Sequence, residues 1–383
     1  MRLDNHEALH QLLRYVAMTD GVSDLNLLTG WRPYVEIEGI HQAVDGFDMA
    51  LSKEEMTFIA NQFYHGSAAM EEMNRTREGI NTAYMVHEHG RAMDDPLRGK
   101  RFRFRVNMMR GVDWQGGANI QITVRPLPGI PKMPEEYGIP PEVMDNFWHP
   151  EGIVLITAPT GNGKTTLLGS MVRKALEDLT FSTKFVTVED PVEIIFENVL
   201  RDMLNRGITP TSMVHQSEVP TSIKSFAAAV REFMRRHPGK AIVGELRDLE
   251  TINAAIEIAL TGHQVLATTH TTGVVATIQR LISGFPLDEK LIKKQDFLYT
   301  MRLIVSQRLI RGVNGKKFAI REWMIFDREA RNKLLDTPLA NLYVVLQDMV
   351  PKHGQSWITD LNRALKEGRL SPESYKILEA EYG

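Results

Sequence analysis

The sequence predicts an α/β protein whose main domain is a doubly wound parallel sheet, preceded by a smaller α/β domain. From residue 151 onward, apolar strand-like runs alternate with helix-like runs. The strand candidates are 153–157, 184–189, 240–244, 264–269 and 317–325. A glycine-rich loop separates the first of these strands from a helix-like stretch at 167–179. Such alternation is typical of parallel sheets with helices on both faces, which bind ligands beyond the carboxyl ends of their strands.

The smaller domain is expected at the N-terminus. Leucines and a valine at helical spacing favour a helix over 5–18, and alternating runs favour strands at 34–39, 101–106 and 121–125. In 101–106 three arginines alternate with apolar residues, so the arginines share one face of the strand.

Proline density marks the boundary between the two domains. Seven prolines lie within 126–150, which predicts a semi-stiff linker instead of regular structure. We therefore expect an N-terminal domain at 1–125, a linker at 126–150, the main domain at 151–349 and a polar helical tail at 350–383. The sequence assigns no function to the tail.

Composition and charge narrow the possible function classes. Of the 383 residues, 43% are hydrophobic and 24% charged, as in ordinary folded proteins. The net charge of −3 gives no general attraction to nucleic acid or anionic lipid, and the lack of cysteine excludes a disulfide framework. The N-terminus does not resemble a signal peptide, and no apolar run approaches the ~18–20 residues of a membrane span. Any membrane role is expected to come through partners or an amphipathic surface.

The glycine-rich loop predicts a binding site for ATP and Mg²⁺. Its glycines let the backbone approach the phosphates, while consecutive N–H groups and the following helix N-terminus attract anions. Lys164 is expected to reach the β- and γ-phosphate oxygens, and the hydroxyl of Thr165 to hold Mg²⁺. Ala158 stands where the usual pattern begins with glycine. The residues expected to bind the nucleotide are Pro159, Thr160, Gly161, Asn162, Gly163, Lys164, Thr165 and Thr166.

Two apolar strands of the main domain end in carboxylates. The strand at 184–189 ends in Glu189, and the strand at 240–244 is followed by Glu245. Carboxylates at a strand end beside a phosphate loop orient Mg²⁺ through water or take a proton from an attacking water. We expect Glu189 and Glu245 to join Thr165 on the metal side, with Glu245 as the base. Each acidic turn, taken alone, is also compatible with an ordinary surface turn.

Two histidines flank the strand candidate at 264–269. His263 precedes the strand and His270 follows it. Zinc ligation is a poor interpretation, because no cysteine or nearby acid completes a ligand set. A polar cluster that senses the γ-phosphate fits better, and His270 is expected to take part in it because it lies at the strand's carboxyl end.

Taken in order, these motifs resemble the secretion-superfamily ATPases of type II and type IV systems. The motifs are APTGNGKTT at 158–166, VEDPVE at 188–193, GELRD at 244–248 and TGHQVLATTHT at 261–271. SQRL at 306–309 and ARN at 330–332 resemble C-terminal signatures of the same family. The chain is similar to the branch of the twitching-motility retraction ATPases. Segments near 65–100 and 197–215 are longer than in that branch, which favours the type IVB secretion and conjugation subgroup, the DotB/TraJ type.

The resemblance implies a RecA-like phosphate-loop ATPase domain behind a PAS-like N-terminal domain. It implies a homo-hexamer that binds ATP between the two domains, and it implies that Arg105 and Arg125 contact the triphosphate. An arginine there neutralises charge that develops during phosphoryl transfer. Without the resemblance, the arginines of 101–105 would be read as the solvated basic face of an edge strand.

The leading hypothesis is a hexameric ATPase that powers a type IVB secretion or conjugation machine. It would be cytoplasmic and recruited peripherally to the inner membrane by that apparatus. A pilus retraction motor is the nearest alternative. A ring-shaped nucleic-acid translocase belongs to another class: the basic and aromatic run at 98–105 supports it, and the net charge of −3 opposes it, so no direct nucleic-acid contact is expected. A non-hydrolysing ATP-binding scaffold is disfavoured by the presence of Lys164 and all the acidic residues.

Overall fold

A computed structural model describes residues 2–37, 39–88, 95, 97, 99–112, 117–219 and 222–382. The chain divides into two compact units, Met1–Gly129 and Ile130–Gly383. Arg98, the first residue of the basic run noted above, lies outside the described residues.

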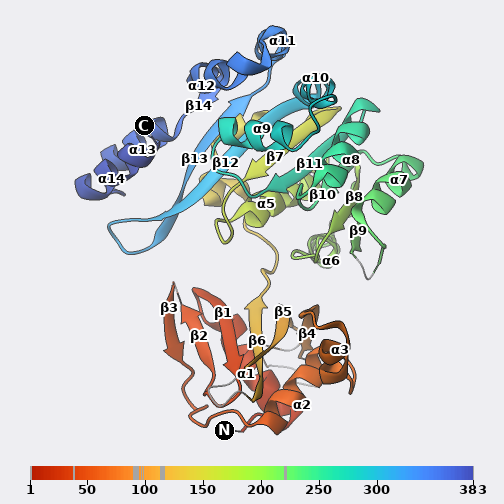
Figure 1. Cartoon of the computed structure of the whole chain (residues 1–383), viewed down its shortest axis with the longest axis vertical. Helices are drawn as coiled ribbons and strands as arrows, with labels where there is room; N and C mark the ends of the chain where they lie inside the picture. Colours follow the sequence, from red (N-terminus) through yellow and green to blue (C-terminus); the bar gives the residue numbers. More distant parts are fainter. Residues whose placement is uncertain are drawn as a thin grey trace. The chain divides into compact units, whose positions relative to one another are not determined.

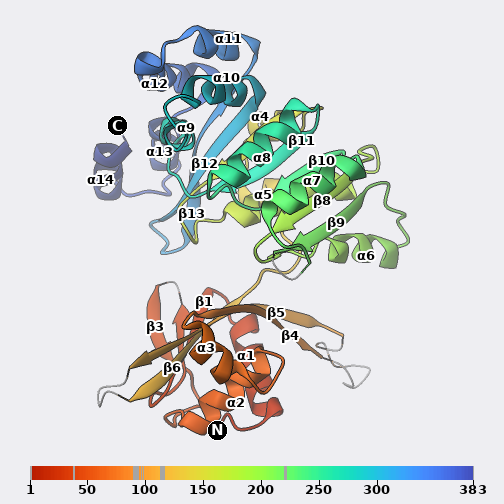
Figure 2. The same cartoon turned by 45° about the vertical axis from the view of Figure 1, so that its right-hand side comes forward.

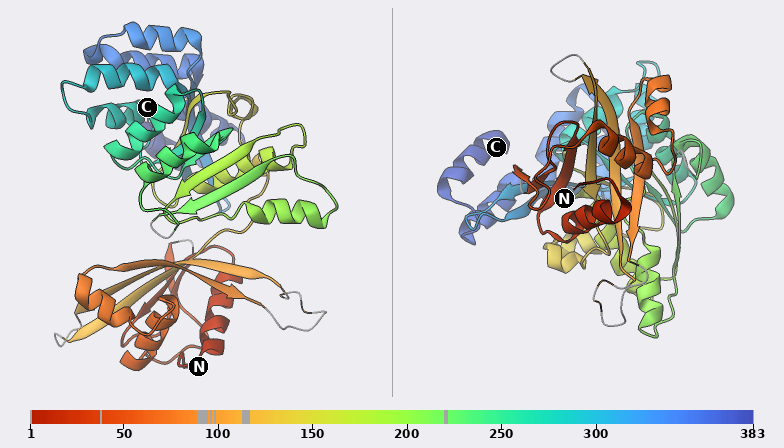
Figure 3. Two further views of the ribbon diagram at one scale, coloured as in Figure 1. Left: turned by 90° about the vertical axis from the view of Figure 1, so that its right-hand side faces the viewer. Right: turned by 90° about the horizontal axis from the view of Figure 1, so that it is seen from below.

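The first unit is a smaller α/β domain, as expected. Its described strands form one antiparallel sheet in the order β3-β2-β1-β6-β5-β4. The helices cover one face of this sheet (Figure 3), and the core lies between the two layers. The strands are β1 Val22–Leu28, β2 Tyr34–Ile37, β3 Ile40–Ala43, β4 Ile80–His87, β5 Arg101–Val112 and β6 Ala118–Pro126; the helices are α1 His6–Met18, α2 Lys53–Phe63 and α3 Ala69–Thr76.

The second unit contains the expected parallel sheet with helices on both faces (Figure 1). Its described strands follow the order β14-β13-β12-β7-β11-β10-β8-β9, and the six from β12 to β9 run parallel. The strands are β7 Gly152–Thr157, β8 Lys184–Glu189, β9 Met213–Glu218, β10 Lys240–Val243, β11 Gln264–Thr269, β12 Met301–Arg311, β13 Lys317–Ile325 and β14 Gly354–Gln355. The strand expected at 317–325 is therefore present but antiparallel to its neighbour β12.

Helices on the two faces of this sheet bury separate apolar cores. The helices α7 and α8 cover strands β8, β10 and β11 on one face (Figure 2). The opposite face packs against α4, α5 and α6. The helices are α4 Pro141–Asp145, α5 Lys164–Glu177, α6 Glu197–Asn205, α7 Phe226–Arg236, α8 Leu249–Leu260, α9 Val274–Ser283, α10 Lys290–Thr300, α11 Arg328–Asp336, α12 Leu342–His353, α13 Trp357–Lys366 and α14 Pro372–Tyr382, with short 3₁₀ turns at Pro134–Tyr137 and Leu339–Asn341.

The proline-rich segment contains more regular structure than its composition suggests. From residue 130 it belongs to the second unit, and Val143 and Phe147 are fully buried in that unit's core. Pro134 and Pro141 begin the 3₁₀ turn and α4. The first position of a helix tolerates proline because its N–H needs no intrahelical partner.

The tail expected at 350–383 is helical and packs against the sheet. Its boundary falls inside α12, and α13 and α14 follow. The side chains of Trp357 and Leu361 are buried against Ile310 and Ile320 of the β12–β13 hairpin. Among the described residues, no helix combines the length and apolar character that a membrane crossing requires.

Candidate functional site

The phosphate loop leaves the carboxyl end of β7 and enters α5. Gly161 and Gly163 have positive φ of 75° and 78°, which glycine adopts without steric cost. A Cβ on Gly163 would also lie 2.8 Å from Nε2 of Gln307, so a larger residue there would displace the Gln307 amide. Ala158 is fully buried and its N–H donates to the Thr269 carbonyl, so this position fits a methyl group. The loop backbone therefore has a conformation that can bind an anion, and it leads directly into a helix N-terminus, which also attracts anions.

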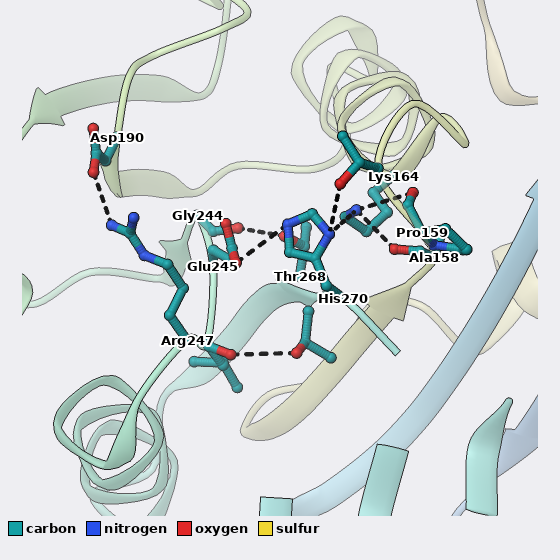
Figure 4. Close-up of polar contacts among 12 residues, drawn as sticks. Ala158, Pro159, Lys164, Asp190, Gly244, Glu245, Arg247, Thr268 and His270 are labelled. Atoms are coloured by element: carbon teal, nitrogen blue, oxygen red, sulfur yellow. Dashed lines mark hydrogen bonds and ion pairs between the residues drawn. The ribbon is translucent and has the colours of Figure 1, made fainter. Parts of the chain in front are cut away.

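Lys164 lies under this loop. Its ammonium donates to the carbonyls of Ala158 at 2.8 Å and Pro159 at 3.3 Å, and it lies 3.1 Å from Nδ1 of His270 (Figure 4). Burial lowers the pKa of Lys164, while the carboxylates of Glu245 and Glu193 oppose that shift. The ammonium is thus close to the loop and faces the acidic strand ends.

His270 connects Lys164 to Glu245. Its Nε2 lies 3.2 Å from Oε1 of Glu245, and its Nδ1 lies 3.4 Å from the hydroxyl of Thr160. Because a lysine ammonium only donates, Nδ1 of His270 must accept, which leaves the proton on Nε2 to be donated to Glu245. Three predicted site residues thus form one hydrogen-bonded row (Figure 4).

The backbone on either side of Glu245 is fixed by neighbouring strand ends. The Gly244 N–H donates to Val188, the Leu246 N–H donates to Thr268, and the Thr268 hydroxyl donates to the Gly244 carbonyl. A Cβ on Gly244 would approach Cα of Glu189 to 3.1 Å. The absence of a side chain there lets the two acidic strand ends lie close together.

Glu189 is buried at the end of β8. Burial raises its pKa to about 7, although hydrogen bonds from the Thr187 hydroxyl at 2.6 Å and from Nε2 of Gln216 at 3.1 Å favour the ionised form. Gln216 lies on β9, which was not among the expected strands. The supporting residue was missed because its polar strand lacks an apolar run.

Arg247 lies beside these acidic strand ends, and no role was predicted for it from the sequence. Its guanidinium donates to Asp190 at 2.8 Å and lies 5.4 Å from the ring centroid of Phe226. The hydrogen bond with Asp190 raises the pKa of Arg247. The GELRD motif contained this arginine, and its position four residues beyond the buried strand β10 was the available signal.

His263, to which the sequence assigned no site role, and the two predicted arginines, Arg105 and Arg125, have the following contacts within their own units. His263 is at the opposite end of β11 from His270 and contacts Thr261, so it takes no part in this cluster. Arg105 and Arg125 belong to the first unit, where they are partners across β5 and β6. Arg125 forms a bidentate ion pair with Asp24: its Nε lies 2.9 Å from Oδ1 and its Nη2 lies 2.8 Å from Oδ2.

The residues at the loop fit a nucleotide with its magnesium ion better than a metal bound by protein alone. Across the described ranges, no group of three or more acidic or histidine side chains is arranged to hold a metal ion. Mg²⁺ typically takes few protein ligands and completes its shell with water and phosphate oxygens. Thr165 in the first turn of α5, together with the acidic strand ends, supplies that kind of partial ligand set.

The raised pKa of Glu189 predicts a pH-dependent stability that glutamine removes. Between pH 4.5 and about 7 the unfolded chain loses this proton and the folded chain keeps it, so folding stability falls as pH rises. In Glu189→Gln, without nucleotide, the free energy of unfolding at pH 8 should exceed that of the wild type by about 3 kcal/mol. The difference should shrink to near zero by pH 4.5. Urea denaturation at both pH values measures it, and a difference that does not change with pH would contradict the assignment.

Comparison with known proteins identifies the family. Residues 134–335, a little over half of the chain, match the family described as type II/IV secretion system protein. A type IV pilus retraction ATPase, PilT, of Pseudomonas aeruginosa is 35% identical over 201 residues, which cover 52% of this chain and 54% of that protein. The match thus spans about half the length of that relative.

Solved structures extend the likeness over the whole chain. The ATPase DotB of Legionella pneumophila has a TM-score of 0.84 and 32% identity, and the match covers 100% of this chain and 98% of that one. The pilus retraction motor PilT with bound ADP has a TM-score of 0.74 and 26% identity, covering 96% and 94%. The expected resemblance to the type IVB subgroup is confirmed, and the chain belongs to the type II/IV secretion system protein family.

Proposed function

We propose that this chain hydrolyses ATP to drive a type IVB secretion or conjugation machine. The observation that carries the proposal is the row formed by Lys164, His270 and Glu245 beneath a glycine loop of anion-binding geometry. The full-length likeness to DotB supports the choice of machine.

In this proposal the loop residues 159–166 hold the triphosphate. Backbone N–H groups and the α5 N-terminus attract the phosphate oxygens, and Lys164 turns from the carbonyls of Ala158 and Pro159 to the β- and γ-oxygens. Magnesium, held by Thr165 and through water by Glu189 and Glu245, would neutralise charge that develops on the phosphates.

Glu245 acts as the general base in the proposed reaction. Its carboxylate lies at a strand end, is partly exposed and accepts a hydrogen bond from His270. It can therefore take the proton of a water that attacks the γ-phosphorus. His270, which also contacts Thr160 of the loop, would hold Glu245 in place and respond to occupancy of the γ-phosphate position.

Substitutions at Lys164 and Glu245 should separate binding from turnover. Lys164→Ala should weaken ATP binding by at least about tenfold, because the loss of a charged hydrogen-bond donor costs roughly 1.5–3 kcal/mol. Glu245→Gln should bind ATP like the wild type but lose turnover by about 10²-fold or more, because an amide oxygen is a poor proton acceptor. Nucleotide titration and phosphate release measure the two effects. Wild-type turnover in Glu245→Gln would remove this residue from the catalytic role.

We further propose that Arg105 and Arg125 act on the triphosphate within a homo-hexamer. Arg105→Ala and Arg125→Ala should each reduce turnover by at least about tenfold, because arginine stabilises charge in phosphoryl transfer. Arg101→Ala, at an exposed position on the same strand, is the matched control and should retain activity. Phosphate release measures turnover and light scattering measures assembly. An active strict monomer would contradict the ring, and stimulation of the wild type by single-stranded DNA that is lost at high salt would favour a translocase.

The proposed location is the cytoplasm, with recruitment to the inner membrane by the secretion apparatus. Deleting that apparatus should move the chain from the membrane fraction to the soluble fraction, because the net charge of −3 provides no general attraction to anionic lipid. Cell fractionation with and without the apparatus tests this. Membrane association that survives both the deletion and high salt would contradict it. Release on deletion of pilus components, but not of secretion components, would favour the retraction alternative, which the likeness to PilT supports.

A further inference from the structure

We propose that Gln307 and Arg321 position the phosphate loop and couple it to residues 137–138, close to the boundary between the two units. The inference deepens the proposed ATPase function and rests on it. It gives a role to the SQRL segment at 306–309, one of the two C-terminal segments that carried the family resemblance.

Gln307 holds the phosphate loop from strand β12. Its Nε2 donates to the Asn162 carbonyl at 2.7 Å, and it is the atom that a Cβ on Gly163 would meet. Two residues further along β12, the Leu309 N–H donates to Oδ1 of Asn162 at 2.8 Å. The tip of the loop is therefore attached to β12 through both the backbone and the side chain of Asn162.

Arg321 determines which way the Gln307 amide points. Its Nε donates to Oε1 of Gln307 at 2.8 Å. A guanidinium only donates, so the amide oxygen must face Arg321 and the amide nitrogen must face the loop. Both side chains are 4% exposed, so water cannot easily replace either partner. Arg321 is thus a positioning residue that acts through Gln307.

The two terminal nitrogens of the same guanidinium contact the segment that follows the boundary between the two units. Nη1 of Arg321 donates to the Gly138 carbonyl at 2.7 Å, and Nη2 donates to the Tyr137 carbonyl at 3.0 Å. This segment lies eight to nine residues after the division at 129/130. Because the guanidinium is planar and rigid, a shift at residues 137–138 must either break these bonds or move Gln307 and the loop.

The neighbouring residue Arg308 provides a matched control. Its guanidinium contacts Glu381 and Tyr382 of the C-terminal helix and not the loop. Arg308→Met removes a long polar side chain from the same strand while leaving the contacts of Gln307, Leu309 and Asn162 in place. An effect specific to the loop should appear at position 307 and not at 308.

The first test is nucleotide affinity. Gln307→Met keeps the side-chain volume and removes the hydrogen bonds to Asn162 and Arg321. ADP with Mg²⁺ should bind this variant about tenfold more weakly, because the loop loses the buried hydrogen bond at Asn162 that holds it in place, and one such bond is worth about that factor. Arg308→Met should bind like the wild type. Equal affinity in all three proteins would overturn the positioning role, whereas failure of the wild type to bind nucleotide would instead overturn the proposed function.

The second test measures coupling. In the wild type, saturating ADP with Mg²⁺ should slow amide exchange in a peptide spanning residues 130–140, and Gln307→Met should abolish this difference. The coupling would be overturned if nucleotide slowed amide exchange in this peptide equally in Gln307→Met and in the wild type. It would also be overturned if bound nucleotide did not slow exchange in the wild type. If Gln307→Met does not fold, Gln307→Glu replaces it. That carboxylate keeps the partner of Arg321 but presents oxygen, not N–H, to the Asn162 carbonyl, so the same loss of response is expected.

Discussion

The site depends on a buried ammonium that lies between loop carbonyls and an imidazole. Lys164 cannot rest unpaired at that depth, and its contacts with Ala158, Pro159 and His270 satisfy all three of its donors. This arrangement fixes the neutral tautomer of His270 and hence the hydrogen bond to Glu245. Hydrogen bonds and charge therefore link the phosphate loop to His270 after β11 and to Glu245 after β10.

Residues at the carboxyl ends of apolar strands were predictable from the sequence. The runs before Ala158, Glu189 and Glu245 are buried strands, and parallel pairing necessarily brings their ends to one edge. The α/β class and the parallel sheet followed from the same runs, and the family followed from the resemblance carried by the ordered motifs; all three are confirmed. The roles assigned to individual site residues remain proposals.

Residues that act by supporting others were not predictable. Gln216, Gln307 and Arg321 each serve the site through hydrogen bonds between elements distant in sequence. Nothing in the local pattern of β12 and β13 shows that an arginine would be buried there, because burial of a guanidinium depends on carbonyls supplied by residues 137–138. Proline content alone does not distinguish a linker from packed structure, because prolines at first helical positions are compatible with packed helices.

The two edge strands of the sheet in the second unit, β14 and β9, affect the tendency of the protein to aggregate. An exposed edge strand offers unpaired backbone groups to other chains and is a site of aggregation. At one end, β14 is only two residues long, too short to serve as a template. At the other end, the polar strand β9 replaces the apolar run that edge-to-edge association favours. The polarity that obscured β9 in the sequence thus provides Gln216 as a hydrogen-bond donor to Glu189, and it also makes this edge strand a poorer template for pairing with other chains.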